Sequence, residues 1–330
     1  MEAEMNDNWK SLRIGVTGAA GFVGARLVRA LVRNGARVRA LIHHTPLDDQ
    51  VEIMRGDVSD PGILSDFSNG LDGIFHLAGA LGHRGISERD FMRVNGEAVS
   101  TLLQQARRHG VKRIVHFGSA GIFGLTSGRK LLREGDPGHP VDAYEKSKRA
   151  GEEAALAWQA PPEVSLIRPG WVYGPGDRRT FKLIHRIHSG IFFVAGKGEI
   201  LQTPVYVDDL VEAALAVYLK GKAGRDYNAA AEAVTVNRLA ASIARALGRK
   251  DRFIHVPMAF VLPPAVILET IFGLAGREAP LSRPRLAFFR RGKPLDTSRI
   301  RTELDVDFPT SLDEGMAKTI RAYRAAGWLS

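Results

Sequence analysis

Residues 12–24 read LRIGVTGAAGFVG, a short apolar strand pattern that leads into three evenly spaced glycines. A nucleotide pyrophosphate needs a turn of this kind. Gly18 permits the tight bend, Gly21 lets phosphate groups approach the backbone, and Gly24 lets the following helix pack against the strand. The free N–H groups and the dipole of the helix start also favour an anion. The G-x-x-G-x-x-G spacing is one residue longer than the G-x-G-x-x-G fingerprint, so the alternative is a glycine-rich turn without a ligand.

The first half of the chain alternates between short apolar strands and amphipathic helices. We expect strands at 12–16, 37–42, 51–54, 73–77, 112–117 and 164–167, and helices at 24–33, 91–109 and 143–157. Repeated units of this length predict an α/β fold with a doubly wound parallel sheet. Beyond residue 169 the sequence is less regular and richer in glycine and proline. We therefore predict a dinucleotide-binding domain at 1–169 and a smaller, mixed substrate-binding region at 170–330, interwoven around one cleft.

The composition excludes several classes of function. The 330 residues contain no cysteine, which rules out disulfides and thiolate metal sites, and we expect no metal centre. The net charge of +10 is spread over short clusters such as 283–293, without the aromatic–basic interleaving of nucleic-acid binders. The first ten residues are polar and acidic, unlike a signal peptide. These features predict a cytoplasmic protein that acts on a small molecule and not on nucleic acid.

Residues 253–276 form a strongly apolar stretch, FIHVPMAFVLPPAVILETIFGLAG. Its length approaches that of a membrane span, but Pro257, Pro263, Pro264 and Glu269 interrupt it and argue against a transmembrane helix. Three alternatives remain for this segment: a hydrophobic lid, a dimer surface, or a peripheral membrane contact.

The sequence YEKSK (144–148) places a phenol and an ammonium four residues apart, on one face of a predicted helix. A free phenol titrates near ~10, and a neighbouring lysine lowers that pKa toward neutral pH, where the phenol can exchange protons. Ser119 follows the predicted strand 112–117, at the edge where open α/β sheets bind ligands. Its hydroxyl could hydrogen-bond a substrate oxygen beside Tyr144. The alternatives are a surface Tyr–Lys pair and a serine that bonds its own backbone.

With these residues in place, the chain resembles the extended short-chain dehydrogenases/reductases of the epimerase/dehydratase type. The ordered matches cover nearly the whole chain and are TGAAGFVG (17–24), GDVSD (56–60), HLAG (76–79), VNGEAVSTLLQQA (94–106), HFGSAGIFG (116–124), YEKSK (144–148), IRPGWVYGPGD (167–177), VYVDDLVEAAL (205–215) and DTSRIRTELDVDFPTSLDEGM (296–316). The resemblance implies a Rossmann-type sheet, an NAD(P)-dependent enzyme and, as the usual assembly, a homodimer.

The resemblance also implies roles for individual residues. Ser119, Tyr144 and Lys148 are expected to be catalytic, and Lys148 also to hold the nicotinamide ribose. Asn95 is expected to support helix geometry or a proton relay, the alternative being a helix cap. The expected cofactor-binding set is Gly18, Gly21, Phe22, Val23, Gly24, Asp57, Val58, Ala78, Gly79, Tyr144, Lys148, Pro169 and Val172. Asp57 and Val58 flank the adenine in this assignment, although Asp57 could also be a simple turn aspartate.

The residues after the second predicted strand bear on the choice of dinucleotide. An acidic residue about twenty positions beyond the glycines binds the ribose 2′-hydroxyl of NAD and repels the 2′-phosphate of NADP. Here the chain reads Ile42-His43-His44, without a carboxylate. His43, His44 and Arg26 could offer positive charge or hydrogen bonds to a phosphate, unless the two histidines are simply solvated. We predict NADP(H) in preference to NAD(H).

Two departures from the nucleotide-sugar enzymes of this superfamily bear on the substrate. Trp171 stands where those enzymes usually carry an asparagine. Gln202-Thr203-Pro204 stands where they commonly carry an arginine that binds diphosphate through a charge-assisted contact. These departures argue against a nucleotide-sugar substrate.

Aromatic residues take the place of those polar contacts. Trp171, Phe181, Phe192, Phe193 and the apolar stretch 253–276 are similar to the branch that contains 3β-hydroxysteroid dehydrogenases and dihydroflavonol reductases, although each aromatic could instead belong to the core. His83 and Arg84 follow the fourth predicted strand, where they could contact substrate or belong to a mobile lid.

We therefore expect an oxidoreductase that interconverts a secondary alcohol and a ketone on a hydrophobic small molecule. One alternative is a nucleotide-sugar epimerase or dehydratase that retains its dinucleotide. Another is a protein that keeps the fold for cofactor sensing or for structure. The presence of Ser119, Tyr144 and Lys148 together argues against this last class, since a protein without turnover needs none of them.

Overall fold

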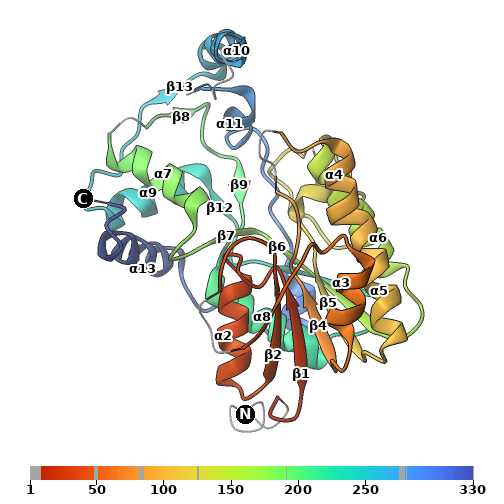
Figure 1. Ribbon diagram of the computed structural model, residues 1–330. Helices are drawn as coiled ribbons and strands as arrows, with labels where there is room; N and C mark the ends of the chain where they lie inside the picture. The colour runs from red at the N-terminus through yellow and green to blue at the C-terminus, as the bar shows by residue number, and fades with distance from the viewer. Residues whose placement is uncertain are drawn as a thin grey trace.

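The computed structural model describes residues 9–47, 51–81, 85–124, 126–190, 192–274, 279 and 281–329, except the side chains of 284 and 285. Its centre is a seven-stranded sheet with the strand order β11-β6-β5-β4-β1-β2-β3 (Figure 1). All neighbouring pairs in it are parallel. The strands are β1 Arg13–Thr17, β2 Arg37–Ile42, β3 Glu52–Arg55, β4 Gly73–His76, β5 Arg113–Phe117, β6 Glu163–Pro169 and β11 Arg225–Ala229. The predicted doubly wound, Rossmann-type fold is confirmed.

Helices cover both faces of this sheet, because its strands other than the exposed edge strand β3 are mostly buried and each helix turns an apolar stripe toward them. On one face α2 (Gly24–Arg33) and α8 (Val207–Lys220) share a core with the fully buried Trp9. On the other face α3 (Pro61–Ser68), α5 (Ala98–Arg108) and α6 (Ala143–Leu156) form a second core. The two layers bury the strands and leave their carboxyl ends as the edge available to a ligand.

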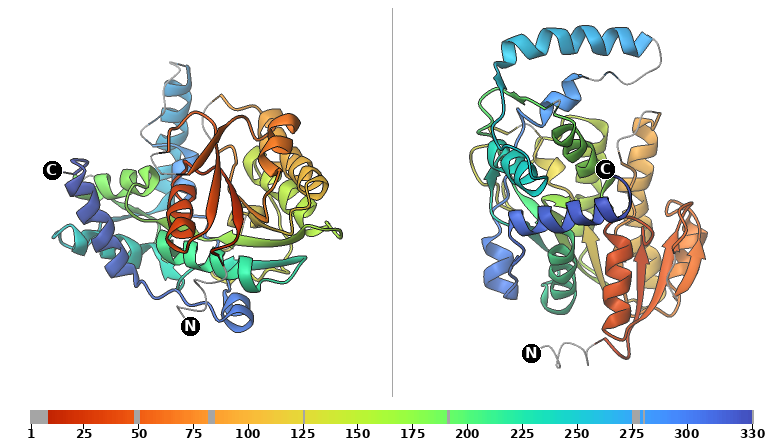
Figure 2. Two further views of the ribbon diagram at one scale, coloured as in Figure 1. Left: turned by 60° about the horizontal axis from the view of Figure 1, so that its bottom comes forward. Right: turned by 90° about the vertical axis from the view of Figure 1, so that its left-hand side faces the viewer.

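The second region lies beside and above that edge (Figure 1). Its short strands pair as β10-β7, β12-β9 and β13-β8, and α7, α9 and α13 enclose a core of their own. The elements are β7 Trp171–Tyr173, α7 Arg178–His188, β8 Val194–Ala195, β9 Leu201–Gln202, β10 Pro204–Tyr206, β12 Val234–Thr235, α9 Val236–Ala246, β13 His255–Val256, α10 Met258–Leu274, α11 Arg283–Ala287, α12 Ser298–Leu304 and α13 Leu312–Ala325. The helix α10 lies at the outer end of the molecule, opposite the N-terminal end (Figure 2).

The C-terminal half of the chain also completes the central sheet. Strand β11 pairs with β6, with Arg225 opposite Ser165, and α8 covers the same side as α2. Sequence patterns located β6 but not β11, because β11 is a short RDYNA segment without a run of apolar residues. The division of the chain near residue 169 stays a prediction.

Two helices differ from the sequence expectation. The segment expected as one helix at 91–109 consists of α4 (Glu88–Met92), a π-helical turn η1 (Arg93–Glu97) and α5. The π turn carries Asn95, and such turns are frequent at functional sites. Helix α3 was not expected, although Asp60 accepts hydrogen bonds from the backbone N–H groups of Gly62 and Ile63, and Pro61 stands at the first helical position. Both are start signals of a helix.

Two buried histidines lie side by side at the carboxyl ends of β4 and β5. His76 and His116 are register partners, and their ring centroids are 5.2 Å apart. Burial lowers the pKa of His76 to about 3 and the pKa of His116 well below its ordinary value, and the charge of Lys148 adds to both shifts. His76 Nδ1 is 2.8 Å from Thr17 Oγ1, whereas neither ring nitrogen of His116 has a partner among the described residues. Both rings are therefore neutral at neutral pH.

This pair predicts a pH-dependent stability. The unfolded chain takes up protons on these histidines near pH ~6.5 while the folded chain does not, so the free energy of unfolding falls as the pH drops below that value. His116→Phe keeps the ring and removes two unpaired nitrogens. We expect this variant to be at least as stable as the native chain. Below this pH its free energy of unfolding should decrease less steeply than that of the native chain, by up to about 1.4 kcal/mol per pH unit.

Urea unfolding between about pH 7 and pH 5 measures both effects. His139→Phe, at an exposed position, is the matched control and should keep the native slope. A His116→Phe variant whose stability falls with pH as steeply as that of the native chain would contradict the neutral, buried state of this ring.

Candidate active site

A cavity of about 520 Å³ opens at the carboxyl edge of the sheet. The ends of β1, β4 and β5, the start of α2 and the first turns of α6 contribute to its wall. It brings together most of the residues predicted for the cofactor and the chemistry, namely Gly18, Gly21, Phe22, Val23, Gly24, His43, His44, Ala78, Gly79, Ser119, Tyr144, Lys148, Pro169, Trp171 and Val172. The glycine turn and the Ser–Tyr–Lys set are far apart in sequence and line one cavity.

The turn between β1 and α2 has the close backbone approaches that its glycines predict. Gly18 has φ +67°, and a Cβ on it would lie 2.8 Å from the amide nitrogen of Ala78. A Cβ on Gly24 would lie 2.2 Å from Gly18 O, so glycine is needed for α2 to begin against the turn. No side chain caps the N-terminus of α2, and although Ala25 N donates to Gly21 O, other N–H groups at this uncapped start remain for an anion. The residues present therefore fit the pyrophosphate of a dinucleotide.

Three polar side chains meet at the opposite side of the cavity. Ser119 precedes a short 3₁₀ helix (η2, Ala120–Phe123), and its Oγ accepts a hydrogen bond from Gly121 N at 3.0 Å. Tyr144 and Lys148 lie one turn apart on α6, whose start is capped by Asp142 accepting from Glu145 N. This arrangement places a hydroxyl, a phenol and an amine at the edge where the predicted chemistry needs them.

The electrostatics of Tyr144 differ from the sequence expectation. Burial raises the pKa of Tyr144 above its ordinary value, and the hydrogen bond with Ser119 and the charge of Arg179 only partly offset this effect. The expected lowering by Lys148 alone is therefore wrong for this environment, because desolvation of the phenolate is the larger effect. Tyr144 holds its proton at neutral pH and is available as an acid.

Lys148, one helical turn after Tyr144 on α6, is buried. Its Nζ donates a hydrogen bond to Phe117 O at 2.7 Å. Burial lowers the pKa of Lys148 to about 8, while the nearby Glu152 carboxylate opposes the shift. The amine therefore remains charged at neutral pH but lies close to its titration range.

A buried ion-pair network connects the elements that carry Ser119, Tyr144 and Lys148. Glu152 of α6 accepts a hydrogen bond from Ser119 N at 2.8 Å, and it pairs with Arg168 of β6 at 2.6 Å. Arg168 also pairs with Asp226 of β11 at 3.1 Å and donates to Asn228 Oδ1. The side chains of Glu152 and Arg168 are each 2% exposed, so the pair is shielded from water. It ties α6, the loop after β5, and two strands to one another.

Asn95 acts as a link and not as a helix cap. Its Oδ1 accepts from Ala80 N at 2.8 Å, and its Nδ2 donates to Ala80 O and to Ser147 Oγ. It thereby connects the loop after β4 to α6. This agrees with the expected support of helix geometry, and Asn95 does not line the cavity.

His43 and His44, the residues after β2 that bear on the choice of dinucleotide, line the cavity. His43 and His44 are exposed, and their ring centroids are 3.6 Å apart. Arg26, the other cation considered there, donates instead to Asp208 Oδ1 and to Pro175 O, with its guanidinium over the Phe22 ring. Arg26 is therefore occupied by the second region, which leaves the two histidines as the groups available to a 2′-phosphate.

Asp57 and Val58 are not among the residues that line this cavity, and their position beside the adenine stays a prediction. The Asp57 carboxylate accepts hydrogen bonds from the backbone and side chain of Ser59 and pairs with Arg93. Val58 is buried in the core under α3. Asp57 therefore behaves as a turn aspartate in this structure, because its own loop and η1 satisfy its oxygens.

The remaining predicted substrate contacts divide into three groups. Trp171 lines the cavity. Phe181 and Phe192 pack against the core of the second region, and Phe193 packs against the small core under α10, so these three are core residues and not cavity wall. His83 and Arg84 lie outside the described residues.

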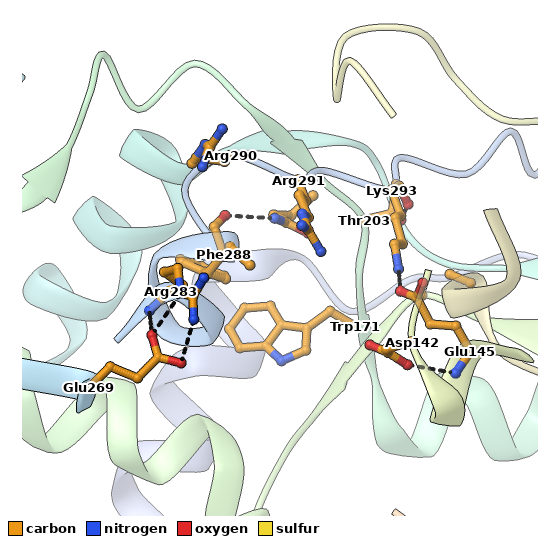
Figure 3. A pocket seen from close by; sticks show the side chains of 14 residues that line it. Asp142, Glu145, Trp171, Thr203, Glu269, Arg283, Phe288, Arg290, Arg291 and Lys293 are labelled. Atoms are coloured by element: carbon orange, nitrogen blue, oxygen red, sulfur yellow. Dashed lines mark hydrogen bonds and ion pairs between the residues drawn. The ribbon is translucent and has the colours of Figure 1, made fainter. Parts of the chain in front are cut away.

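A second cavity of about 690 Å³ adjoins the first, and Gly170 and Trp171 line both. Figure 3 shows Trp171 between Glu269, Arg283 and Phe288 on one side and Asp142, Glu145 and Lys293 on the other. Arg290 and Arg291 also line this outer cavity. Lys293 pairs with Glu145 and Arg283 pairs with Glu269, whereas no carboxylate among the described residues pairs with Arg290 or Arg291. The outer cavity is therefore rich in cations, with an aromatic surface at its centre.

Sequence reasoning missed several of these residues. Arg179 had a usable signal, because Asp177 caps α7 by accepting from Arg179 N and Thr180 N, which places Arg179 in the first turn after the matched GPGD motif. Glu152 and Arg168 are ordinary charged residues in sequence, and nothing in their spacing shows that they pair. In the sequence the cations of the outer cavity belong to a short basic cluster at 283–293, which gives no sign of a cavity.

A family model described as "NAD dependent epimerase/dehydratase family" matches residues 14–230. The chain is 28% identical over 343 residues to ceramide reductase of Caulobacter vibrioides, which covers 96% of each protein. It is also 28% identical over 332 residues to sterol demethylase protein B of Methylococcus capsulatus, covering 95% of this chain and 99% of that one.

A solved structure shows the same fold along nearly the whole chain. The structure of MoeE5 in complex with UDP-glucose and NAD superposes with a TM-score of 0.75 at 25% identity, over 95% of this chain and 99% of that one. The family model covers more than half of the chain, and the relatives match along nearly all of it. The chain therefore belongs to the NAD dependent epimerase/dehydratase family, enzymes of the extended short-chain dehydrogenase/reductase type that its motifs predicted.

Proposed function

We propose that this enzyme interconverts a ketone and a secondary alcohol, with NADP(H) as hydride carrier. The observation that carries the proposal is the placement of Ser119, Tyr144 and Lys148 on the wall of the cavity that the glycine turn also lines. An acid with its proton in place, a hydroxyl beside it and a buried cation below it are the groups that carbonyl reduction requires.

In the reducing direction Tyr144 Oη gives its proton to the carbonyl oxygen of the substrate. Ser119 Oγ donates a hydrogen bond to the same oxygen, which orients the carbonyl and stabilises the charge that develops on it. Arg179 places positive charge near the phenolate that remains on Tyr144, and Lys148, one helical turn away on α6, is the second cation proposed to stabilise it. The bound dinucleotide supplies the hydride. In the oxidising direction the Tyr144 phenolate accepts the proton of the alcohol.

The two cavities suggest what kind of substrate is bound. In this proposal the dinucleotide and the reacting carbonyl occupy the inner cavity, and the rest of the substrate lies against Trp171 and in the outer cavity. Trp171 and Phe288 offer apolar contact there, while Arg290 and Arg291 favour a polar or anionic end. We therefore propose an amphiphilic, largely apolar substrate. The names of the two curated relatives, a ceramide reductase and a sterol demethylase protein, support a lipid. A homodimer, the usual assembly implied by the resemblance, is the proposed oligomeric state.

The first prediction concerns the acid. Tyr144→Phe removes the proton donor without changing the shape of the site, so kcat for ketone reduction should fall by about 10²–10⁴. The Kd for NADPH should stay within about threefold, since the glycine turn holds the pyrophosphate. Steady-state kinetics on a panel of hydrophobic ketones and fluorescence titration of NADPH measure the two quantities.

Tyr218→Phe is the matched control, because Tyr218 is buried in the core near Gly73, away from the cavity. It should leave kcat and the Kd for NADPH within about twofold of the native values. A Tyr144→Phe variant that keeps more than about one tenth of the native kcat would exclude Tyr144 as the acid.

The second prediction is a pH profile. Lys148, with its pKa near 8, is charged below that pH and neutral above it, and only the charged form stabilises the Tyr144 phenolate. The kcat/KM for reduction should therefore be level in the acidic range and fall by up to tenfold per pH unit above about pH 8.

Lys148→Arg retains the charge at every accessible pH and should shift this fall out of the measured range, at a lower overall rate. Lys148→Met should be slow throughout and without the inflection. An inflection that persists unchanged in Lys148→Met would assign the titration to another group.

The third prediction concerns the dinucleotide. The native enzyme should bind NADP⁺ more tightly than NAD⁺. His43→Asp introduces a carboxylate that repels the 2′-phosphate and accepts from the 2′-hydroxyl, so the preference should shift toward NAD⁺ by about tenfold or more. His43→Gln removes the ring without adding charge and serves as control. Isothermal titration calorimetry measures the affinity of each protein for NADP⁺ and for NAD⁺. If the native enzyme and both variants bind the two dinucleotides equally tightly, His43 does not select NADP⁺.

A second candidate function is a nucleotide-sugar epimerase or dehydratase with a retained dinucleotide. The sequence lacks the usual arginine before β10, but the outer cavity contains Arg283, Arg290 and Arg291 from another segment. Three guanidinium groups could hold a diphosphate, as a nucleotide sugar requires. The MoeE5 structure contains UDP-glucose on the same fold.

Two measurements separate the candidates. A reductase releases its dinucleotide, so the purified protein should lack the absorbance of bound cofactor, whereas an enzyme that retains its dinucleotide should carry it through purification. In a thermal-shift assay NADP⁺ should raise the apparent Tm and UDP- or dTDP-sugars should not. Stabilisation by a UDP-sugar together with copurified NAD(P) would favour the second candidate.

A further inference from the structure

The helix α10 carries apolar side chains on both of its faces. Its inward face packs Val261 and Ala265 against Leu286 of α11. Its outward face exposes Phe260 by 74%, Ile267 by 59%, Ile271 by 56% and Leu274 by 88%, and Ile254 just before it by 76%. An ordinary surface helix turns polar residues outward, so α10 lacks the polar face that water would favour.

The charge distribution along α10 makes the same point. Glu269 is the one charged residue in its sequence, and it pairs with Arg283 at 3.0 Å on the inward side. Thr270 is the most polar exposed side chain, and its hydroxyl donates to Val266 O within the helix. The outward face therefore presents hydrocarbon at the outermost end of the molecule, where Figure 2 shows α10 extending across that end.

We propose that α10 docks on the surface of an anionic lipid bilayer, lying in the interface with Phe260, Ile267 and Ile271 inserted. None of the helices in the described part of the chain combines the length and apolarity needed to cross a bilayer. We therefore propose that α10 lies on the membrane surface and does not span the membrane. Burying these side chains in the acyl region removes apolar surface from water, which is the driving force for such helices.

Basic residues on either side of α10 in the chain select an anionic surface. Arg249, Lys250 and Arg252 precede it and Arg290 and Arg291 follow it, whereas Arg283 is neutralised by Glu269. Each of the acidic residues Asp251 and Glu269 already pairs with an arginine. Cations next to a membrane-bound helix strengthen its binding to an anionic lipid surface. A second copy of the chain would bring the same positive charges to the contact, which argues against α10 as a dimer surface.

The position of α10 also connects the membrane to the site. Glu269 of α10 and Arg283 of α11 line the outer cavity, so a lipid that leaves the bilayer beside α10 meets the cavity with Trp171 at its centre. This delivery route rests on the proposed function. The docking itself rests on α10 and does not require the enzyme to be a ketone reductase.

Vesicle flotation of the full-length protein tests the docking. We expect the protein to float with vesicles of phosphatidylcholine containing about 30 mol% phosphatidylglycerol, to float weakly with phosphatidylcholine alone, and to be released in part by high salt. The triple variant Phe260→Ser, Ile267→Ser, Ile271→Ser should bind these vesicles about tenfold or more weakly.

The matched control changes three other exposed apolar residues, as Val32→Ser, Ile53→Ser, Leu131→Ser, at positions that are 43%, 42% and 42% exposed. It should keep native vesicle binding within about twofold. Circular dichroism and NADP⁺ titration check that both triple variants are folded. If the α10 variant does not fold, Ile271→Glu alone is measured, with the same expected loss.

Native protein that does not float with anionic vesicles, or α10 variants that float as the native protein does, would overturn the proposal. A native dimer that the α10 substitutions convert to monomers, with no vesicle binding, would assign this face to a second copy instead. Vesicle binding by a protein that reduces no ketone would leave the docking supported and refute the proposed function.

Discussion

The buried ion pair between Glu152 and Arg168 fixes the geometry on which the site depends. Glu152 belongs to the helix that carries Tyr144 and Lys148, and its other oxygen receives the backbone N–H of Ser119. Arg168 joins this helix to β6 and, through Asp226, to β11. Removing one partner of such a pair leaves a buried, uncompensated charge, which costs about 3–5 kcal/mol. The three reactive side chains therefore keep their spacing because one shielded salt bridge holds their three elements together.

Much of this architecture is visible in the sequence because it follows local rules. The glycines at 18 and 24 are required by close backbone approaches, and the positions of Tyr144 and Lys148 follow from helical spacing alone. The pairing of Glu152 with Arg168, the use of β11 in the sheet and the arginines of the outer cavity could not be predicted in this way. Each depends on contacts between distant segments, for which charged residues and a five-residue strand leave no periodic signal. The pKa of Tyr144 also depends on burial, which the sequence does not specify.

The apolar segment 253–276 shows where sequence and structure complement each other. Its composition left a lid, a dimer surface and a membrane contact open. The structure adds that α10 is apolar on its outward face and borders the outer cavity through Glu269. Together with the cations before and after α10, these facts place an apolar, cation-flanked helix beside the outer cavity, which adjoins the cavity that the glycine turn lines.

In the proposed function the enzyme transfers hydride between NADP(H) and an external ketone. The most direct measurement uses NADPH deuterated at C4 of the nicotinamide, a panel of hydrophobic ketones, and mass spectrometry of the products. We expect one NADP⁺ to be released for each alcohol formed, and the alcohol to carry the deuterium on its carbinol carbon. Conversion of a UDP- or dTDP-sugar without net oxidation of the dinucleotide, and no turnover of any ketone, would contradict the proposed function.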